Sequence, residues 1–210
     1  MTDPAASPAA SPAASPAAPL VAVLDDDADL GASVARLLAR NRMDARAFTD
    51  PRALLAILPD CAFGCVISDI QMGEMDGFAF ADALRARDPA VSLVFMTAWP
   101  TTAHAVDAVR RHGGIDYLEK PIDEPRLIAA VAEGLGWSAR ERRIAAMTAA
   151  FTRRERDVFD LLVRGHSNKE IAERLAISAR TVEDHRAAIV TKTRTNGLAQ
   201  LIALSRGEAV

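Results

Sequence analysis

Between residues 20 and 136, five short apolar runs alternate with five longer stretches whose apolar residues recur at helical spacing. Runs of four or five residues rich in Val, Ile, Leu and Phe are typical of buried strands. Regular strand–helix alternation favours a parallel sheet with helices on both faces, so we predict a doubly wound (βα)5 domain of the α/β class. The predicted strands are 20–24, 45–48, 65–68, 92–96 and 115–118, and the predicted helices lie near 28–41, 51–58, 76–87, 101–112 and 123–136.

Polar side chains follow four of these strands. They are Asp25, Asp26 and Asp27 after the first strand, Asp69 after the third, Thr97 after the fourth, and Lys120 with Pro121 close behind the fifth. Each residue alone also fits a helix cap, a turn or a solvated charge, but the carboxyl ends of parallel strands share one edge of a sheet. Clustered carboxylates select Mg²⁺, and a lysine and a hydroxyl can bind the oxygens of a phosphorylated carboxylate. The pattern therefore predicts Mg²⁺-dependent phosphoryl transfer to an aspartate.

These residues resemble the receiver domain of two-component response regulators. The matching segments are Val23-Leu24-Asp25-Asp26-Asp27, Ser68-Asp69-Ile70-Gln71-Met72 and Gly114-Ile115-Asp116-Tyr117-Leu118-Glu119-Lys120-Pro121. The resemblance implies that Asp69 is the phospho-acceptor and that Asp25 and Asp26 hold Mg²⁺ with the Gln71 backbone carbonyl. It further implies that Thr97 and Tyr117 form a switch pair and that Lys120 binds the phosphoryl group.

Two local features depart from a simple match. Three consecutive aspartates leave the register of the acidic pair ambiguous, and we choose Asp25 and Asp26 because they directly follow the apolar run. Gly73 stands where receivers usually have proline, which makes the loop after Asp69 more flexible.

The charge of the chain changes sign along its length. Residues 20–133 carry 11 Lys and Arg against 18 Asp and Glu, whereas residues 134–210 carry 14 against 9. The basic part favours nucleic-acid binding only if a motif supports it. We predict four helices there, at 152–164, 168–175, 179–193 and 198–204, with a capping box at Thr152 and Glu155 and an N-cap at Ser178. Two short helices joined by a tight turn indicate a helix-turn-helix.

This region resembles the LuxR-type helix-turn-helix of the NarL/FixJ family. The matching segments are Phe151-Thr152-Arg153-Arg154-Glu155-Arg156, Gly165-His166-Ser167-Asn168-Lys169-Glu170-Ile171-Ala172 and Ile177-Ser178-Ala179-Arg180-Thr181-Val182-Glu183-Asp184-His185-Arg186. Together with the receiver, they narrow the resemblance to FixJ-type regulators. The predicted core is Ile171, Leu175, Val182 and Ile189, and the candidate DNA contacts are Asn168, Lys169, Arg180, Thr181, Glu183, Asp184, Arg186 and Lys192. The two acidic residues repel phosphate but can accept a hydrogen bond from the cytosine N4 amino group.

We expect four regions along the chain. They are a disordered Ala/Ser/Pro tail at 1–19, the receiver at 20–136, a linker at 137–147 that is helical from Ser138, and an all-α, four-helix DNA-binding domain at 148–210. A stripe of Leu198, Leu201, Ile202 and Ser205 serves either the core or a dimer seam.

We therefore expect a cytoplasmic, non-enzymatic transcription regulator, because no signal peptide or membrane-length apolar run is present. The expected partners are a sensor histidine kinase, double-stranded promoter DNA and, on activation, a second copy of the chain; RNA polymerase is a further candidate. The main alternative is a phosphatase or phosphotransferase of the haloacid dehalogenase type, for which Asp25 and Asp27 supply the required Asp-x-Asp spacing. That alternative leaves Asp69 and the DNA-binding region unexplained. A regulator that works without phosphorylation is a third alternative, which the intact acidic cluster disfavours.

Overall fold

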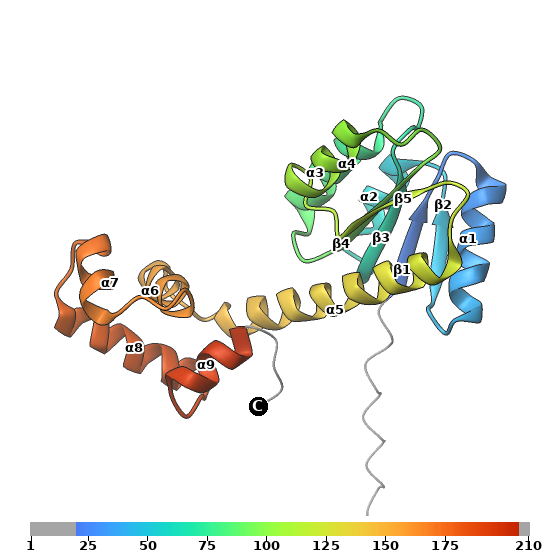
Figure 1. Ribbon diagram of the computed structural model, residues 1–210. Helices are drawn as coiled ribbons and strands as arrows, with labels where there is room; N and C mark the ends of the chain where they lie inside the picture. Colours follow the sequence, from blue (N-terminus) through green and yellow to red (C-terminus); the bar gives the residue numbers. More distant parts are fainter. Residues whose placement is uncertain (1–19, 206–210) are drawn as a thin grey trace, which may run out of the picture.

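The computed structural model describes residues 20–205, apart from the side chains of Leu198 and Leu204, so the predicted tail at 1–19 lies outside the described residues. An α/β domain is followed by a helical domain (Figure 1). The strands are β1 (Leu20–Leu24), β2 (Ala45–Phe48), β3 (Phe63–Asp69), β4 (Ser92–Thr97) and β5 (Asp116–Glu119). The helices are α1 (Ala28–Arg40), α2 (Pro51–Ile57), α3 (Gly77–Arg87), α4 (Thr102–Arg110), α5 (Glu124–Thr148), α6 (Arg153–Val163), α7 (Asn168–Leu175), α8 (Ala179–Thr193) and α9 (Leu198–Ser205).

The five strands form one parallel sheet in the order β2-β1-β3-β4-β5. Side chains alternate between its faces: Ala22 and Leu24 of β1 pack towards α2, α3 and α4, while Val21 and Val23 pack towards α1 and α5. Both faces of the sheet are therefore covered. This arrangement confirms the predicted doubly wound fold and places the carboxyl ends of the strands along one open edge.

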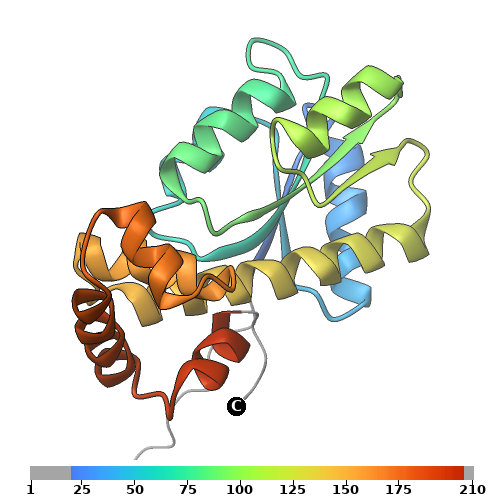
Figure 2. The same cartoon turned by 60° about the vertical axis from the view of Figure 1, so that its left-hand side comes forward.

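Helix α5 is longer than the sequence pattern predicts. It runs without a break from Glu124 to Thr148, so the segment 137–147 that we predict as a linker lies inside it. Gly134 lies inside the helix and does not interrupt it. It faces the sheet, where a β-carbon would come within 2.6 Å of Ser92 Oγ, so close packing requires glycine at this position. Figures 1 and 2 show α5 passing along the sheet and continuing to the helical domain.

The helical domain has its own core, built from all four of its helices. Its buried apolar residues are Phe151, Val158, Phe159, Leu162, Ile171, Val182, Ile189 and Leu201, and Leu175 is partly buried against them. The predicted capping box of Thr152 and Glu155 and the predicted N-cap at Ser178 are both present. Leu201 thus belongs to the core, whereas the side chain of Leu198 lies outside the described residues. Over residues 20–205, no helix combines the length and the apolar character that crossing a membrane requires.

Candidate phosphorylation site and DNA interface

Three carboxylates meet at the carboxyl edge of the sheet. Asp25 follows β1 and Asp69 ends β3, and both are buried, with exposed fractions of 1% and 5%, while Asp26 is exposed. Each of the three presents an oxygen, and these atoms lie within 4.8 Å of one another. Such a set of hard, negatively charged oxygens, open to solvent on one side, fits the ligand preference of Mg²⁺.

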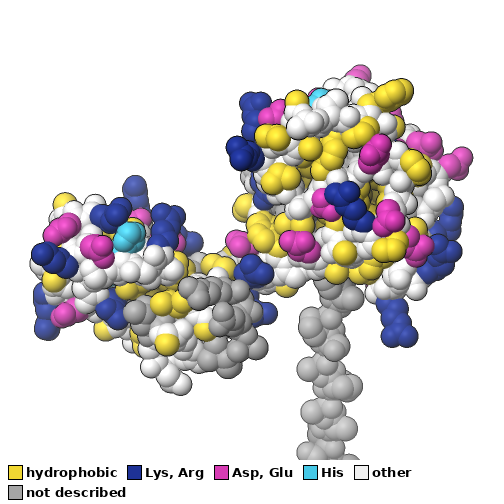
Figure 3. Space-filling view, viewed as in Figure 1, with side chains coloured by type: hydrophobic (Ala, Val, Ile, Leu, Met, Phe, Trp, Pro, Cys, Tyr) yellow, Lys and Arg dark blue, Asp and Glu magenta, His cyan; other side chains and the backbone are white. Residues whose placement is uncertain are grey.

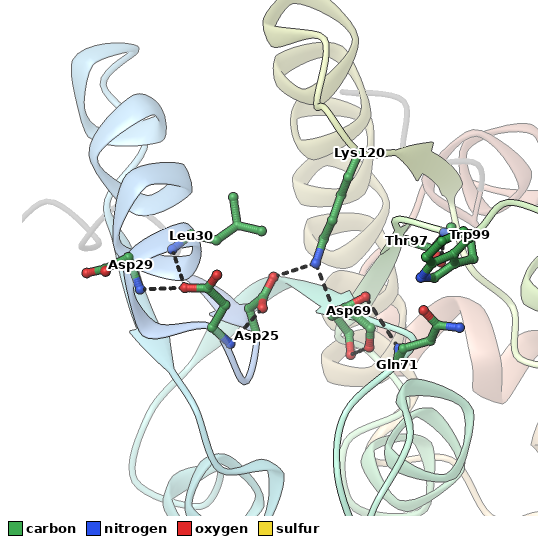
Figure 4. A network of polar contacts seen from close by, with 10 residues as sticks. Asp25, Asp29, Leu30, Asp69, Gln71, Thr97, Trp99 and Lys120 are labelled. Atoms are coloured by element: carbon green, nitrogen blue, oxygen red, sulfur yellow. Dashed lines mark hydrogen bonds and ion pairs between the residues drawn. The ribbon is translucent and has the colours of Figure 1, made fainter.

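Lys120 bridges the two buried carboxylates. Its Nζ lies 2.8 Å from Asp25 Oδ2 and 2.8 Å from Asp69 Oδ2 (Figure 4). Burial raises the pKa of Asp25, and the bonds from Lys120 and from the Asp27 N–H only partly offset this effect. Burial also acts to lower the pKa of Lys120, but its bonds to Asp25 and Asp69 outweigh burial and raise the pKa overall. The site therefore keeps a fixed cation beside Asp69, where phosphoryl oxygens would need a positive partner.

Asp27 caps a helix, unlike Asp25 and Asp26, which belong to the acidic cluster. Its side chain accepts hydrogen bonds from the N–H groups of Asp29 and Leu30, so it caps α1. Asp25 and Asp26, not Asp27, are the members of the triplet that lie beside Asp69. The Asp25–Asp27 pair that a dehalogenase-type reaction needs is thus not assembled.

The backbone around Asp69 is tightly packed. Gly77, the first residue of α3, approaches so closely that a β-carbon there would lie 2.3 Å from the Asp69 carbonyl oxygen. The Gln71 N–H donates to Asp69 Oδ1 at 3.4 Å, so Gln71 lies beside the acceptor. The role of the Gln71 carbonyl as a metal ligand stays a prediction.

The predicted switch residues belong to β4 and β5. Thr97 is fully buried, and its hydroxyl accepts from the N–H of Trp99 at 3.1 Å. The Tyr117 hydroxyl accepts from the N–H of Thr101, just before α4, at 3.3 Å. Both side chains therefore contact the segment that leads into α4, while Trp99 on that segment is 69% exposed.

The exposed face of α8 is the candidate DNA interface. Val182 and Ile189 point into the domain core, and Arg180, Glu183, Asp184 and Ala187 lie on the opposite, exposed side. Lys169 on α7 is also exposed, and Thr181 is half-buried with its hydroxyl against Ser178 Oγ. Figure 3 shows Lys and Arg side chains interspersed with Asp and Glu over this domain. The face is thus charged but not uniformly basic.

Lys192 lies differently from what the sequence suggests. Its Nζ bonds to both carboxylate oxygens of Glu155, which is buried next to the start of α6. We therefore leave Lys192 out of the proposed DNA contacts, because its ammonium already neutralises a buried carboxylate. Arg186 and Asn168 also engage each other, the guanidinium donating to the Asn168 amide oxygen. Sequence reasoning identified Glu155 only as a capping residue, since its pairing with Lys192 spans 37 residues of chain.

Comparison with known families identifies the two domains. The family model "Response regulator receiver domain" matches residues 21–132, more than half of the chain. The chain belongs to the response regulator family. A second model, "Bacterial regulatory proteins, luxR family", matches residues 149–205. The protein is therefore a response regulator with a LuxR-type DNA-binding domain, as the sequence motifs predict.

Several known regulators align over most of this response regulator. It is 35% identical over 192 residues to the transcriptional regulatory protein FixJ of Bradyrhizobium diazoefficiens, covering 88% of this chain and 93% of that protein. It is 34% identical to the tetrathionate response regulatory protein TtrR of Salmonella typhimurium, covering 87% and 89%. The crystal structure of full-length FixJ from B. japonicum matches with a TM-score of 0.53 and 34% identity, covering 90% of this chain and 96% of that one.

Proposed function

We propose that Asp69 accepts a phosphoryl group from a sensor histidine kinase and thereby controls binding of the response regulator to promoter DNA. The observation that carries this proposal is the position of Lys120, 2.8 Å from both Asp25 and Asp69 at the open edge of the sheet. A carboxylate held next to a fixed cation and two further carboxylates suits phosphoryl capture.

Asp69 acts as the nucleophile in the proposed transfer. One of its carboxylate oxygens bonds to phosphorus while the bond between phosphorus and the kinase histidine nitrogen breaks, leaving that nitrogen with the electron pair. Mg²⁺ held by Asp25, Asp26, Asp69 and the Gln71 carbonyl would neutralise charge on the phosphoryl oxygens. Lys120 then exchanges its bond to the Asp69 carboxylate for one to a phosphoryl oxygen, and the Thr97 hydroxyl turns from the Trp99 N–H towards the same group.

The proposed consequence is a change in how two copies of the chain bind DNA. Movement of Thr97 and Tyr117 alters the α4–β5–α5 face, which pairs with a second copy, and the dimer reads two half-sites. The proposed contacts to DNA are Asn168, Lys169, Arg180, Thr181, Glu183, Asp184 and Arg186. We assign the receiver to 20–136, the connection to 137–147 and the DNA-binding domain to 148–210, with RNA polymerase as a further partner at the promoter.

Incubation with acetyl phosphate labelled on phosphorus, in the presence of Mg²⁺, tests the proposal. We expect one phosphate retained per chain, no uptake by Asp69→Asn, and normal uptake by the control Asp60→Asn, which removes an exposed carboxylate elsewhere. Label on Asp69→Asn at the wild-type rate would contradict the assignment. Catalytic release of phosphate from a generic phosphate ester would instead support the phosphatase alternative.

A further inference from the structure

Arg85 of α3 contacts two separate parts of the molecule at once. On one side its guanidinium donates to the carbonyls of His112, at 3.1 Å, and of Gly113, both in the turn that joins α4 to β5. On the other side it lies 5.6 Å from the centre of the Trp137 ring, on α5. Trp137 lies beyond the part of α5 that we assign to the receiver. One side chain therefore links the end of α4 to the helix that leads to the DNA-binding domain.

A second contact holds the same stretch of α5 to α3. Arg142 donates to Asp88 Oδ2 at 2.8 Å and to the Phe63 carbonyl at 2.9 Å, and Asp88 is the C-cap of α3. Between Trp137 and Arg142, Ser138 is 1% exposed. Residues 137–142 are thus docked on the carboxyl end of α3 through Arg85 and Asp88.

Helix α4 is attached weakly along its length and firmly at its end. Ala108 is its buried residue, whereas Val106 and Val109 are 46% and 50% exposed. A helix that buries so little apolar surface shifts at small cost. Just beyond it, His112 Nδ1 lies 2.8 Å from Asp82 Oδ1 on α3, and Arg85 donates to the carbonyls of His112 and Gly113. A shift of α4 therefore acts directly on α3 at Asp82 and Arg85.

The Arg85 guanidinium packs closely against the backbone of Gly113. Gly113 has a φ of +64°, and a β-carbon there would lie 2.6 Å from Arg85 Nη2. The guanidinium is thus hydrogen-bonded to the backbone of this turn and also contacts the Trp137 ring. When the turn moves, the guanidinium must either follow it or break both hydrogen bonds.

We propose that Arg85 is a positioning residue that couples phosphorylation of Asp69 to the direction of α5. In the resting protein it holds residues 137–142 against α3. When α4 shifts after phosphorylation, the carbonyls of His112 and Gly113 carry the guanidinium away from the Trp137 ring. Residues 137–142 then keep only the Arg142 contacts to α3 and β3, and this weaker attachment lets α5 reposition the DNA-binding domain. This inference rests on the proposed function, because it needs a phosphorylation-dependent shift of α4.

The full-length protein carrying Trp99→Phe provides the test, since Trp137 is then its single tryptophan. Trp137 emission is recorded before and after addition of acetyl phosphate and Mg²⁺, and DNA affinity is measured by gel shift in both states. Arg85→Met is compared with Arg87→Met, a matched control whose guanidinium donates to the Ala83 carbonyl of its own helix. Label uptake at Asp69 is measured in every variant.

We expect phosphorylation to change Trp137 emission and to raise DNA affinity about tenfold, a usual size for coupling between two sites, in the parent and in Arg87→Met. In Arg85→Met the emission should no longer respond, and the affinity ratio should fall below twofold while label uptake stays within twofold of the parent. An Arg85→Met protein that keeps both the emission response and the affinity ratio would overturn the proposal.

Two further variants decide the matter if Arg85→Met does not fold. Trp137→Leu keeps Arg85 and removes its partner on α5, and Arg85→Lys keeps a cation but not the two-pronged donor geometry. Both should lower the affinity ratio, and a parent-like ratio in both would contradict the coupling. A parent protein whose DNA affinity does not change on phosphorylation would contradict the proposed function itself.

Discussion

Lys192 of α8 lies 2.8 Å and 2.6 Å from the two carboxylate oxygens of Glu155 at the start of α6. Glu155 is buried, and one of these oxygens also accepts from the Thr152 N–H at 2.7 Å. The ion pair therefore joins α8 to α6, the first helix of the domain, at a point where an unpaired carboxylate would be costly.

Replacing Lys192 should destabilise the DNA-binding domain. We expect Lys192→Gln to lower the free energy of unfolding by about 1–2 kcal/mol, the lower part of the range for a charged hydrogen bond, because the lysine is partly exposed. Lys169→Gln, which removes an exposed lysine on α7, is the control. Urea denaturation followed by circular dichroism measures the difference, and equal stabilities of the two variants would contradict it.

The same pair predicts a pH dependence. The bonds from Lys192 and from the Thr152 N–H hold the pKa of Glu155 below its ordinary value of 4.5. A carboxyl whose pKa is lower in the folded state stabilises the fold above its unfolded pKa, and this stabilisation is lost as the pH falls through the folded-state pKa. Wild type should thus lose more stability than Lys192→Gln when the pH falls from about 5 to 3, and parallel pH profiles would refute this.

Gly77 is expected to be intolerant of any side chain. Gly77→Ala would place a methyl group 2.3 Å from the Asp69 carbonyl, so α3 or the acceptor must shift. We expect a loss of about 1–3 kcal/mol of stability and slower phosphorylation, because the Asp69 carboxylate moves relative to Lys120. Gly73→Ala is the matched control, since a β-carbon there meets nothing within 4 Å. Equal phosphorylation rates in the two variants would show that the approach does not position Asp69.

Glu183 should contribute to base selectivity. Glu183 is exposed on α8. The neighbouring carboxylate, Asp184, forms an ion pair with Arg180, in which Asp184 Oδ1 lies 3.6 Å from Arg180 Nε. A carboxylate accepts from the cytosine N4 amino group, whereas a glutamine prefers adenine, so Glu183→Gln should shift the preference at one base pair of each half-site from C to A by about 1–3 kcal/mol. Selection from random duplexes measures the shift. Asp160→Asn, an equal charge change on an exposed residue of α6, should leave the preference unchanged.

The two cysteines should differ in reactivity. Burial raises the pKa of Cys65 to about 12, whereas Cys61 is half-buried at the edge of the domain. Because the thiolate is the reactive form, a thiol reagent at pH 8 should modify Cys61 and leave Cys65 unmodified in the native protein. Cys61→Ser should abolish native labelling, and rapid labelling of that variant would show that the β3 region opens readily.

The alternation of strands and helices and the acidic cluster could be predicted because both depend on local patterns. Apolar runs identify strands, and polar residues directly after them must meet at the carboxyl edge of a parallel sheet. The start of β3 at Phe63 could not be predicted in the same way, because it depends on pairing with Leu20 across a register shift in β1. The alternation of apolar and polar residues predicts that a strand is present, but it does not show where pairing with the neighbouring strand begins or ends.

The contacts that sequence reasoning missed are long-range. Glycines at 134 and 136 suggest a break in the helix, yet Gly134 is required by close packing on Ser92 and α5 continues. Likewise, an arginine on α3 shows no sign in the sequence of lying over Trp137, 52 positions further along the chain. Such pairings follow from the packing of the completed sheet and its helices, so only the structure reveals them.

Helix α5 is unbroken from Glu124 to Thr148, so the two domains are connected by a continuous helix. The number of residues in this helix fixes how far one domain is rotated relative to the other. Each residue in an α-helix advances about 1.5 Å and turns about 100°, so adding one alanine after Ala145 would rotate the DNA-binding domain by roughly that angle relative to the receiver. Adding seven residues would lengthen the helix by about 10 Å but would return the DNA-binding domain to within about 20° of its original orientation about the helix axis. The length of this one helix therefore sets the direction in which the DNA-binding domain faces relative to the receiver.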